Sequence, residues 1–119
     1  MRYYSKEHLW IDIEGNCATI GICKYFLVRS GSITWISSGE TGKKIQAGDL
    51  LLTLENDKSA IDFPAPVTGL ITESNAAILE DPALLDGLSE LECWICKVEM
   101  TGTDVSSLMT NEEYETFTS

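Results

Sequence analysis

One lysine, Lys58, lies in the stretch LENDKSAIDFPAP (residues 54–66), where the chain turns between two apolar runs. Such an amine has three chemical uses. It can act as a buried catalytic group, it can be a solvated surface charge, or a second enzyme can join it to an activated acid as an amide. A tight hairpin favours the third use, because the bend holds the lysine in a fixed backbone shape that a modifying active site can enclose.

The sequence around Lys58 predicts this hairpin. Asn56 and Asp57 tolerate turn geometry and can hydrogen-bond their own backbone. Pro64 and Pro66 end the second strand, since proline cannot donate to a central ladder. The apolar residues that we expect to share one face of the two strands are Leu50, Leu52, Leu54, Ile61 and Phe63.

Further strands are predicted by alternating apolar residues. LWIDIEG and CATIGIC are expected to form a hairpin around Gly15, and other strands follow at SITWIS, GLITES and WICKVEM. The stretch SGETGKKIQAGD is rich in glycine and predicts a loop.

Short helices are predicted at the margins of these strands. KYFLVRS reads as a brief helix that ends at Gly31, and another helix begins at Pro82 with Asp81 as its N-cap. The tail predicts two helices, at residues 103–109 and 111–117, with Asn111 as the cap of the second. The expected fold is an all-β core with short peripheral helices, in which two small antiparallel sheets form a flattened barrel-sandwich hybrid.

Composition limits the partners. The chain has 119 residues, which suits a single domain over residues 1–119. Its 8 Lys+Arg and 19 Asp+Glu residues give a net charge of −11, which disfavours nucleic acid and anionic membranes and favours partners with basic faces. No stretch approaches the roughly 20 apolar residues of a membrane span. No signal core follows the N-terminus, so a cytoplasmic location is expected.

The four cysteines are expected to be reduced and mostly buried. Cys93 and Cys96 have the C-x-x-C spacing of thiol oxidoreductases, which leaves that activity as a less favoured hypothesis. However, CWICKVEM alternates like a strand, so the two thiols should point to opposite faces. The spacing of Cys17 and Cys23 does not match a zinc ribbon, and no metal site is expected.

The stretch ENDKSAIDFPAPVTG resembles the lipoyl-attachment region shared by lipoyl domains and by the H protein of the glycine cleavage system. The blocks YYSKEHLW, GNCATIGI, GETGKKIQAGD, WICKVEM and EEYETF resemble the H-protein layout in order and spacing, over nearly the whole chain. Biotinyl domains share the hairpin but flank their lysine with methionines, whereas Asp57 and Ser59 flank Lys58 here.

The resemblance implies a lipoyl-domain-like fold and a lipoate joined to Lys58 as an amide. A lipoate ligase or an octanoyl or lipoyl transferase would attach it. The lipoyl arm would then shuttle an aminomethyl group between glycine decarboxylase and aminomethyltransferase, and dihydrolipoyl dehydrogenase would reoxidise it. The protein itself would be a non-catalytic carrier, expected to be a monomer.

The resemblance also names candidate recognition and cleft residues: Glu55, Asp57, Ser59, Asp62 and His8. Asp62 matches a family aspartate near the cleft that shelters the loaded arm. A family glutamate with a similar role is replaced by leucine in His8-Leu9-Trp10. Because of such departures, a second role stays open: an H-like relay or redox-response carrier that donates lipoate to 2-oxo acid dehydrogenases without glycine cleavage.

The single histidine and the aromatic residues have structural explanations. His8 is expected in a strand beside Trp10, where a structural role is commoner than catalysis. The aromatic residues for which we expect core or rim packing are Tyr3, Tyr4, Trp10 and Trp35.

Overall fold

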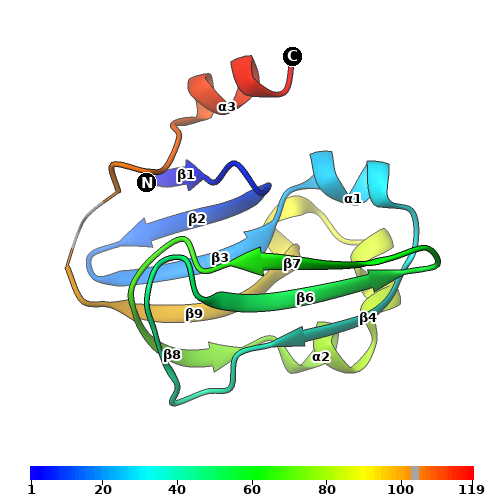
Figure 1. Cartoon of the computed structure of the whole chain (residues 1–119), viewed down its shortest axis with the longest axis horizontal. Helices are drawn as coiled ribbons and strands as arrows, with labels where there is room; N and C mark the ends of the chain where they lie inside the picture. Colours follow the sequence, from blue (N-terminus) through cyan, green and yellow to red (C-terminus); the bar gives the residue numbers. More distant parts are fainter. Residues whose placement is uncertain (103–104) are drawn as a thin grey trace.

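Two antiparallel sheets lie face to face in the computed structural model, which describes residues 1–102 and 105–119 (Figure 1). The larger sheet has the order β1-β2-β3-β9-β8-β5 and the smaller has the order β4-β6-β7. The strands are β1 (Arg2–Tyr4), β2 (Leu9–Glu14), β3 (Cys17–Ile22), β4 (Ile33–Ser38), β5 (Lys44–Ile45), β6 (Leu50–Asn56), β7 (Ala60–Pro64), β8 (Gly69–Ser74) and β9 (Trp94–Met100). The expected all-β fold of two antiparallel sheets is confirmed, and the sheets do not close into a barrel.

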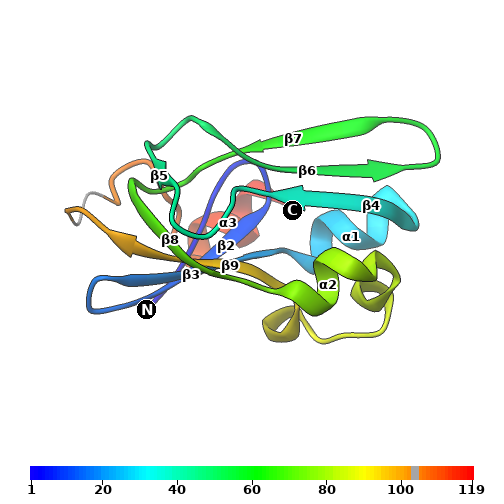
Figure 2. The same ribbon diagram turned by 90° about the horizontal axis from the view of Figure 1, so that it is seen from below.

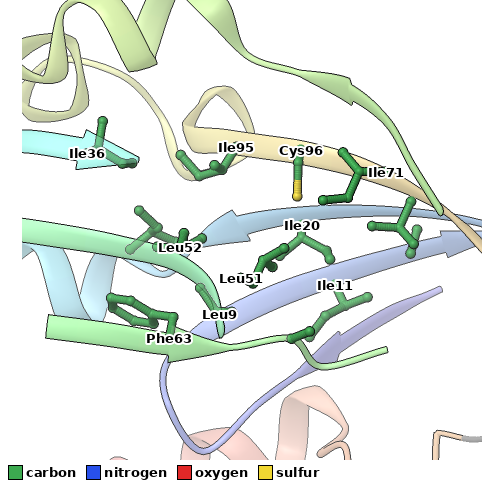
Figure 3. Close-up of a cluster of buried hydrophobic side chains, with 14 of the residues drawn as sticks. Leu9, Ile11, Ile20, Ile36, Leu51, Leu52, Phe63, Ile71, Ile95 and Cys96 are labelled. Atoms are coloured by element: carbon green, nitrogen blue, oxygen red, sulfur yellow. The ribbon is translucent and has the colours of Figure 1, made fainter. Parts of the chain in front are cut away.

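The core fills the space between the two sheets (Figures 2 and 3). Burying each Leu, Ile or Phe side chain stabilises the fold by about 1.5–3 kcal/mol relative to an exposed one. Both sheets contribute fully or almost fully buried residues, among them Leu9, Ile11, Ile20, Ile36, Leu51, Leu52, Phe63, Ile71, Ile95 and Cys96.

The predicted strand positions are largely confirmed, but one core assignment is wrong. Leu52, Leu54 and Phe63 are buried as expected, whereas Leu50 is 56% exposed. The register between β6 and β7 shifts between Leu50 and Leu52, and this irregularity places both Leu51 and Leu52 in the core. A β-bulge breaks the strict alternation from which the position of Leu50 was predicted.

The helices between β3 and β9 are partly as predicted. Helix α1 (Lys24–Ser30) ends before Gly31, whose φ of 76° suits glycine. Helix α2 (Ala76–Glu80) was not anticipated. The 3₁₀ helix η1 (Pro82–Asp86) begins where predicted, although the Asp81 side chain makes no capping hydrogen bond.

The C-terminal segment corrects two predictions. Helix α3 (Asn111–Phe117) is confirmed, but its N-cap is Thr110, which forms a capping box with Glu113. The helix predicted at residues 103–109 is wrong over residues 105–109, which form a turn and a β-bridge from Met109 to Tyr4. Residues 103–104 lie outside the described part of the chain.

The segment before β9 corrects another prediction. Cys93 does not belong to the strand but ends the 3₁₀ helix η2 (Glu90–Cys93). Cys93 and Cys96 therefore do not follow strand alternation, and both side chains are fully buried in the core. Among the described residues, no helix has the length and apolar character needed to cross a bilayer.

Close contact between β8 and β9 requires a glycine, which yields a stability prediction. A Cβ at Gly69 would overlap the carbonyl oxygen of Glu99 and approach Val98 Cγ1 to 2.8 Å. We expect Gly69→Ala to lower the free energy of unfolding by about 1–3 kcal/mol in a urea titration, as overpacking does elsewhere. Gly87→Ala is the matched control, because a Cβ there meets no atom within 4 Å. Equal stability of the two variants would contradict the prediction.

Candidate functional site

Lys58 lies at the apex of the β6–β7 hairpin, which projects beyond the rest of the two-sheet body (Figures 1 and 2). Its side chain is exposed, and none of the ion pairs between described residues involves it. An enzyme can therefore reach this amine without first breaking a salt bridge.

The side chain of Asn56 fixes the turn that carries Lys58. Its Oδ1 accepts hydrogen bonds from the backbone N–H groups of Lys58 and Ser59, each at 2.9 Å. Its Nδ2 donates to the carbonyl of Ser30 at the end of α1, at 3.0 Å. One amide thus shapes the turn and ties it to the neighbouring helix.

Apolar contacts hold the hairpin to α1 further along the strands. Phe26 of α1 meets Phe63 of β7 edge to face, with ring centroids 5.2 Å apart. Such a pair is worth about 0.5–1.5 kcal/mol beyond its buried area. The hairpin is therefore supported at its base by packing and near its apex by the Asn56 hydrogen bond.

An open pocket of about 340 Å³ lies between the end of α1 and the hairpin apex. Residues 29–32 line one side and residues 56–59 line the other. Arg29 lies on this rim with its guanidinium over the Tyr25 ring, 3.6 Å from the centroid, and its Nη1 donates to the Tyr25 carbonyl. Every residue that lines the pocket, apart from Gly31, has a polar or charged side chain.

The structure gathers only some of the predicted recognition residues near Lys58. Asp57 and Ser59 are exposed and line the pocket, and Glu55 is half-buried three residues before the lysine. Asp62 is exposed on β7, where its Oδ1 accepts a hydrogen bond from Thr53 Oγ1 at 2.8 Å, and it does not line this pocket.

His8 lies elsewhere, and its predicted position in a strand is wrong. It precedes β2 with a φ of 71° and stacks on Tyr25, while its Nδ1 lies 2.8 Å from the Tyr114 hydroxyl. Burial lowers the pKa of its imidazole, which favours the neutral ring at pH 7. His8 does not line the pocket. It is connected to the pocket through Tyr25, whose ring contacts both His8 and the pocket residue Arg29.

Leu9 occupies the position where the resemblance places an acidic cleft residue, but it is part of the core. Its side chain is fully buried between the sheets (Figure 3). A carboxylate there would lose its hydration, so this buried position favours leucine over an acidic side chain.

The C-x-x-C pair is not arranged for thiol chemistry. Both thiols are buried, and burial raises the pKa of Cys93 and raises that of Cys96 to about 12. A thiol that stays protonated is a poor nucleophile. Among the described residues, no group of three or more His, Cys, Asp or Glu side chains is placed to hold a metal ion.

Asn56 is the main site residue that the predicted site set omits. Sequence analysis identified it as a turn residue that bonds its own backbone, which the contacts to Lys58 and Ser59 confirm. Its bond to Ser30 joins segments 26 residues apart, and no local pattern signals such a contact.

Two antiparallel sheets that present one exposed lysine at a hairpin apex are the arrangement expected of a carrier domain, a class of protein whose prosthetic group is attached to a lysine. The profile of the family described as "Glycine cleavage H-protein" matches residues 2–119. The chain therefore belongs to the glycine cleavage H-protein family, whose members are lipoyl carriers of the glycine cleavage system.

Individual relatives agree with this assignment. The glycine cleavage system H protein of Thermoanaerobacter sp. (strain X514) is 40% identical over 116 residues, which are 97% of this chain and 91% of that protein. H protein 4 of Aquifex aeolicus is 35% identical over 95% of this chain and 67% of its own length. The crystal structure of an H protein from Mycobacterium marinum superposes with a TM-score of 0.87 at 29% identity, covering 97% of this chain and 94% of that one.

The role of Asn56 can be tested with two substitutions. Asn56→Ala removes every side-chain hydrogen bond, whereas Asn56→Asp keeps an acceptor for Lys58 N and Ser59 N but loses the donor to Ser30. We expect the alanine variant to lose about 1 kcal/mol or more of stability and to exchange the amide protons of residues 58 and 59 faster. The aspartate variant should retain that protection. Equal exchange in all three proteins would show that the side chain does not fix the turn.

Proposed function

We propose that Lys58 carries lipoate in amide linkage and that the protein is a non-catalytic lipoyl carrier, a single unit over residues 1–119. The observation that supports this most directly is the exposed lysine at a hairpin apex whose shape is fixed by Asn56. Family membership over residues 2–119 supports lipoate as the cofactor.

The attachment step needs only an accessible amine from this chain. A lipoate ligase or a lipoyl transferase supplies lipoate as an acyl-adenylate or a thioester, whereas an octanoyl transferase would supply octanoate, into which another enzyme must insert two sulfur atoms. Lys58 Nζ attacks the carbonyl carbon of the acyl group, the new C–N bond forms as the C–O or C–S bond to the leaving group breaks, and the amine proton passes to solvent. The extended hairpin lets the modifying enzyme surround the lysine without contacting the core (Figure 1).

After attachment, the dithiolane would supply all of the redox and group-transfer chemistry. In the proposed cycle the protein shuttles an aminomethyl group between glycine decarboxylase and aminomethyltransferase, and dihydrolipoyl dehydrogenase restores the disulfide. This chain contributes a fixed attachment point and a surface that its partners recognise. Its net charge of −11 favours encounters with basic docking faces of these enzymes. We propose that the carrier is a monomer and that it meets these enzymes in the cytoplasm.

A second candidate function, the H-like relay of lipoate to 2-oxo acid dehydrogenases, is favoured by two observations. Leu9 is fully buried where the family resemblance places an acidic cleft residue, and Asp62 does not line the pocket beside Lys58. Fewer acidic groups near the arm would give weaker retention of an aminomethyl ammonium.

The attachment proposal predicts a single modification at one residue. Coexpression with a lipoate ligase in medium containing lipoate should add the mass of one lipoyl group to the intact protein. Lys58→Arg should gain none, while Lys43→Arg, which changes another exposed lysine, should be modified like the wild type. Failure of several ligases and transferases to modify the folded wild-type protein would refute the proposal.

The glycine-cleavage proposal predicts a second, separate activity of the lipoylated protein. Together with a glycine decarboxylase from the same host, it should support exchange of labelled bicarbonate into the carboxyl group of glycine. Unlipoylated protein and Lys58→Arg serve as controls. No exchange, combined with transfer of the lipoyl group to the lipoyl domain of a 2-oxo acid dehydrogenase by an amidotransferase, would support the relay function instead.

A further inference from the structure

The outer face of the β4-β6-β7 sheet is uncovered and ends at the lysine hairpin. Figure 2 shows β6 and β7 at the edge of the molecule, with none of the described elements over their outer side. Each of these strands has buried residues on the inner side, such as Ile36, Leu54 and Phe63. Their alternating neighbours point outward, which gives the sheet one face in the core and one in solvent.

Two rows of outward residues cross this face next to one another. Cross-strand pairing aligns Trp35 of β4 with Glu55 of β6, and Glu55 with Ala60 of β7. The adjacent row aligns Ser37, Thr53 and Asp62, and the hydrogen bond between Thr53 and Asp62 spans two of its strands. We call these six residues, Trp35, Ser37, Thr53, Glu55, Ala60 and Asp62, the outer sheet face.

Trp35 is unusual on such a surface. Sequence analysis assigned it to core or rim packing, yet 48% of its surface is exposed, whereas Trp10 is 1% exposed. Trp35 stands beside a β-bulge, at the register shift between Ile33 and Trp35. No hydrogen bond, ring stack or cation–π contact joins its side chain to another residue in the described part of the chain.

The composition of the outer sheet face defines the chemistry of its partner. An exposed tryptophan offers a large, rigid apolar surface of the kind that dominates protein interfaces. Glu55 lies opposite Trp35 on β6, and Asp62 lies in the adjacent row on β7. Neither carboxylate forms an ion pair among those found between the described residues. The complementary surface is an apolar or aromatic pocket bordered by lysine or arginine side chains.

The outer sheet face continues into the hairpin that carries Lys58, and this continuity favours the enzyme that acylates Lys58 as its partner. Glu55 lies on the outer sheet face and also stands three residues before Lys58 on the same strand and turn. An enzyme that acylates the free amine must surround the apex, and the strands below it are the nearest surface on which it can rest. The pocket formed with α1 lies beside the same apex, but its rim carries Arg29 and no tryptophan.

We infer that the outer sheet face, with Trp35 as its main apolar contact, is the docking surface for the enzyme that acylates Lys58. This inference rests on the proposed function, because it takes Lys58 as the site of lipoyl attachment. Trp35 is a recognition residue that acts on affinity and does not take part in the transfer chemistry. Glu55 and Asp62 add electrostatic attraction to the basic border of the enzyme's pocket.

Steady-state lipoylation of the purified protein by a lipoate ligase, with lipoate and ATP, tests the inference. Trp35→Ala should raise the KM for this carrier about tenfold with little change in kcat, as loss of one interface hot spot does. Leu91→Ala is the matched control, because Leu91 is 60% exposed in η2, which contacts β3 of the other sheet. Higher salt should raise the KM of the wild type, and Glu55→Gln and Asp62→Asn should reduce that dependence.

A binding readout that needs no turnover complements the kinetics. The chain has three tryptophans and therefore three indole N–H signals, and the Trp35 signal is the one missing in Trp35→Phe. Adding the ligase without ATP should shift or broaden that signal more than those of Trp10 and Trp94.

The outcomes separate the inference from the function on which it rests. Normal KM values for Trp35→Ala, with an unchanged indole signal, would overturn the docking surface while leaving lipoylation of Lys58 intact. Absence of lipoylation in the wild type as well would overturn both. Circular dichroism and urea unfolding of Trp35→Ala confirm that any increase in KM is measured on a folded protein.

Discussion

The hydrogen bonds of the Asn56 side chain are the interaction on which the rest of the site depends. Oδ1 closes the turn onto the Lys58 and Ser59 amides, and Nδ2 fastens that turn to the last residue of α1. A lysine on a freely moving loop would lose conformational entropy each time an enzyme surrounded it. Here the backbone is already held in one shape, and only the lysine side chain has to be ordered.

Sequence patterns predicted most strands because one face of each sheet is buried, so alternation is strongly imposed. They failed where an irregularity breaks the period, as at Leu50, where a register shift puts Leu51 and Leu52 in the core. They also failed at chain ends and short helices, where local hydrogen bonds decide between close alternatives. The capping box assigns the N-cap of α3 to Thr110, one residue before the predicted Asn111.

The sequence predicted those features of the candidate site that depend on neighbouring residues, but not those that depend on contacts between distant segments. The hairpin and its exposed lysine follow from thirteen consecutive residues, so the sequence alone sufficed to place them. The pocket with Arg29, the separation of His8 from Lys58, and the exposure of Trp35 all depend on contacts between distant segments. In particular, Trp35 and Glu55 become neighbours only because β4 pairs with β6 in one register, and no local sequence pattern reveals which strands pair.

The hairpin therefore separates two different environments on either side of one lysine. On one side, the end of α1 supplies a polar pocket with Arg29, and on the other the sheet presents tryptophan and carboxylates. A carrier that visits several enzymes needs the loading enzyme to leave after the amide has formed. If loading uses the outer sheet face, the pocket side stays free for the attached arm. The loading enzyme would then dock on one side of the hairpin while the attached arm lies on the other side. One small domain could bind the enzyme and hold the arm without competition between the two.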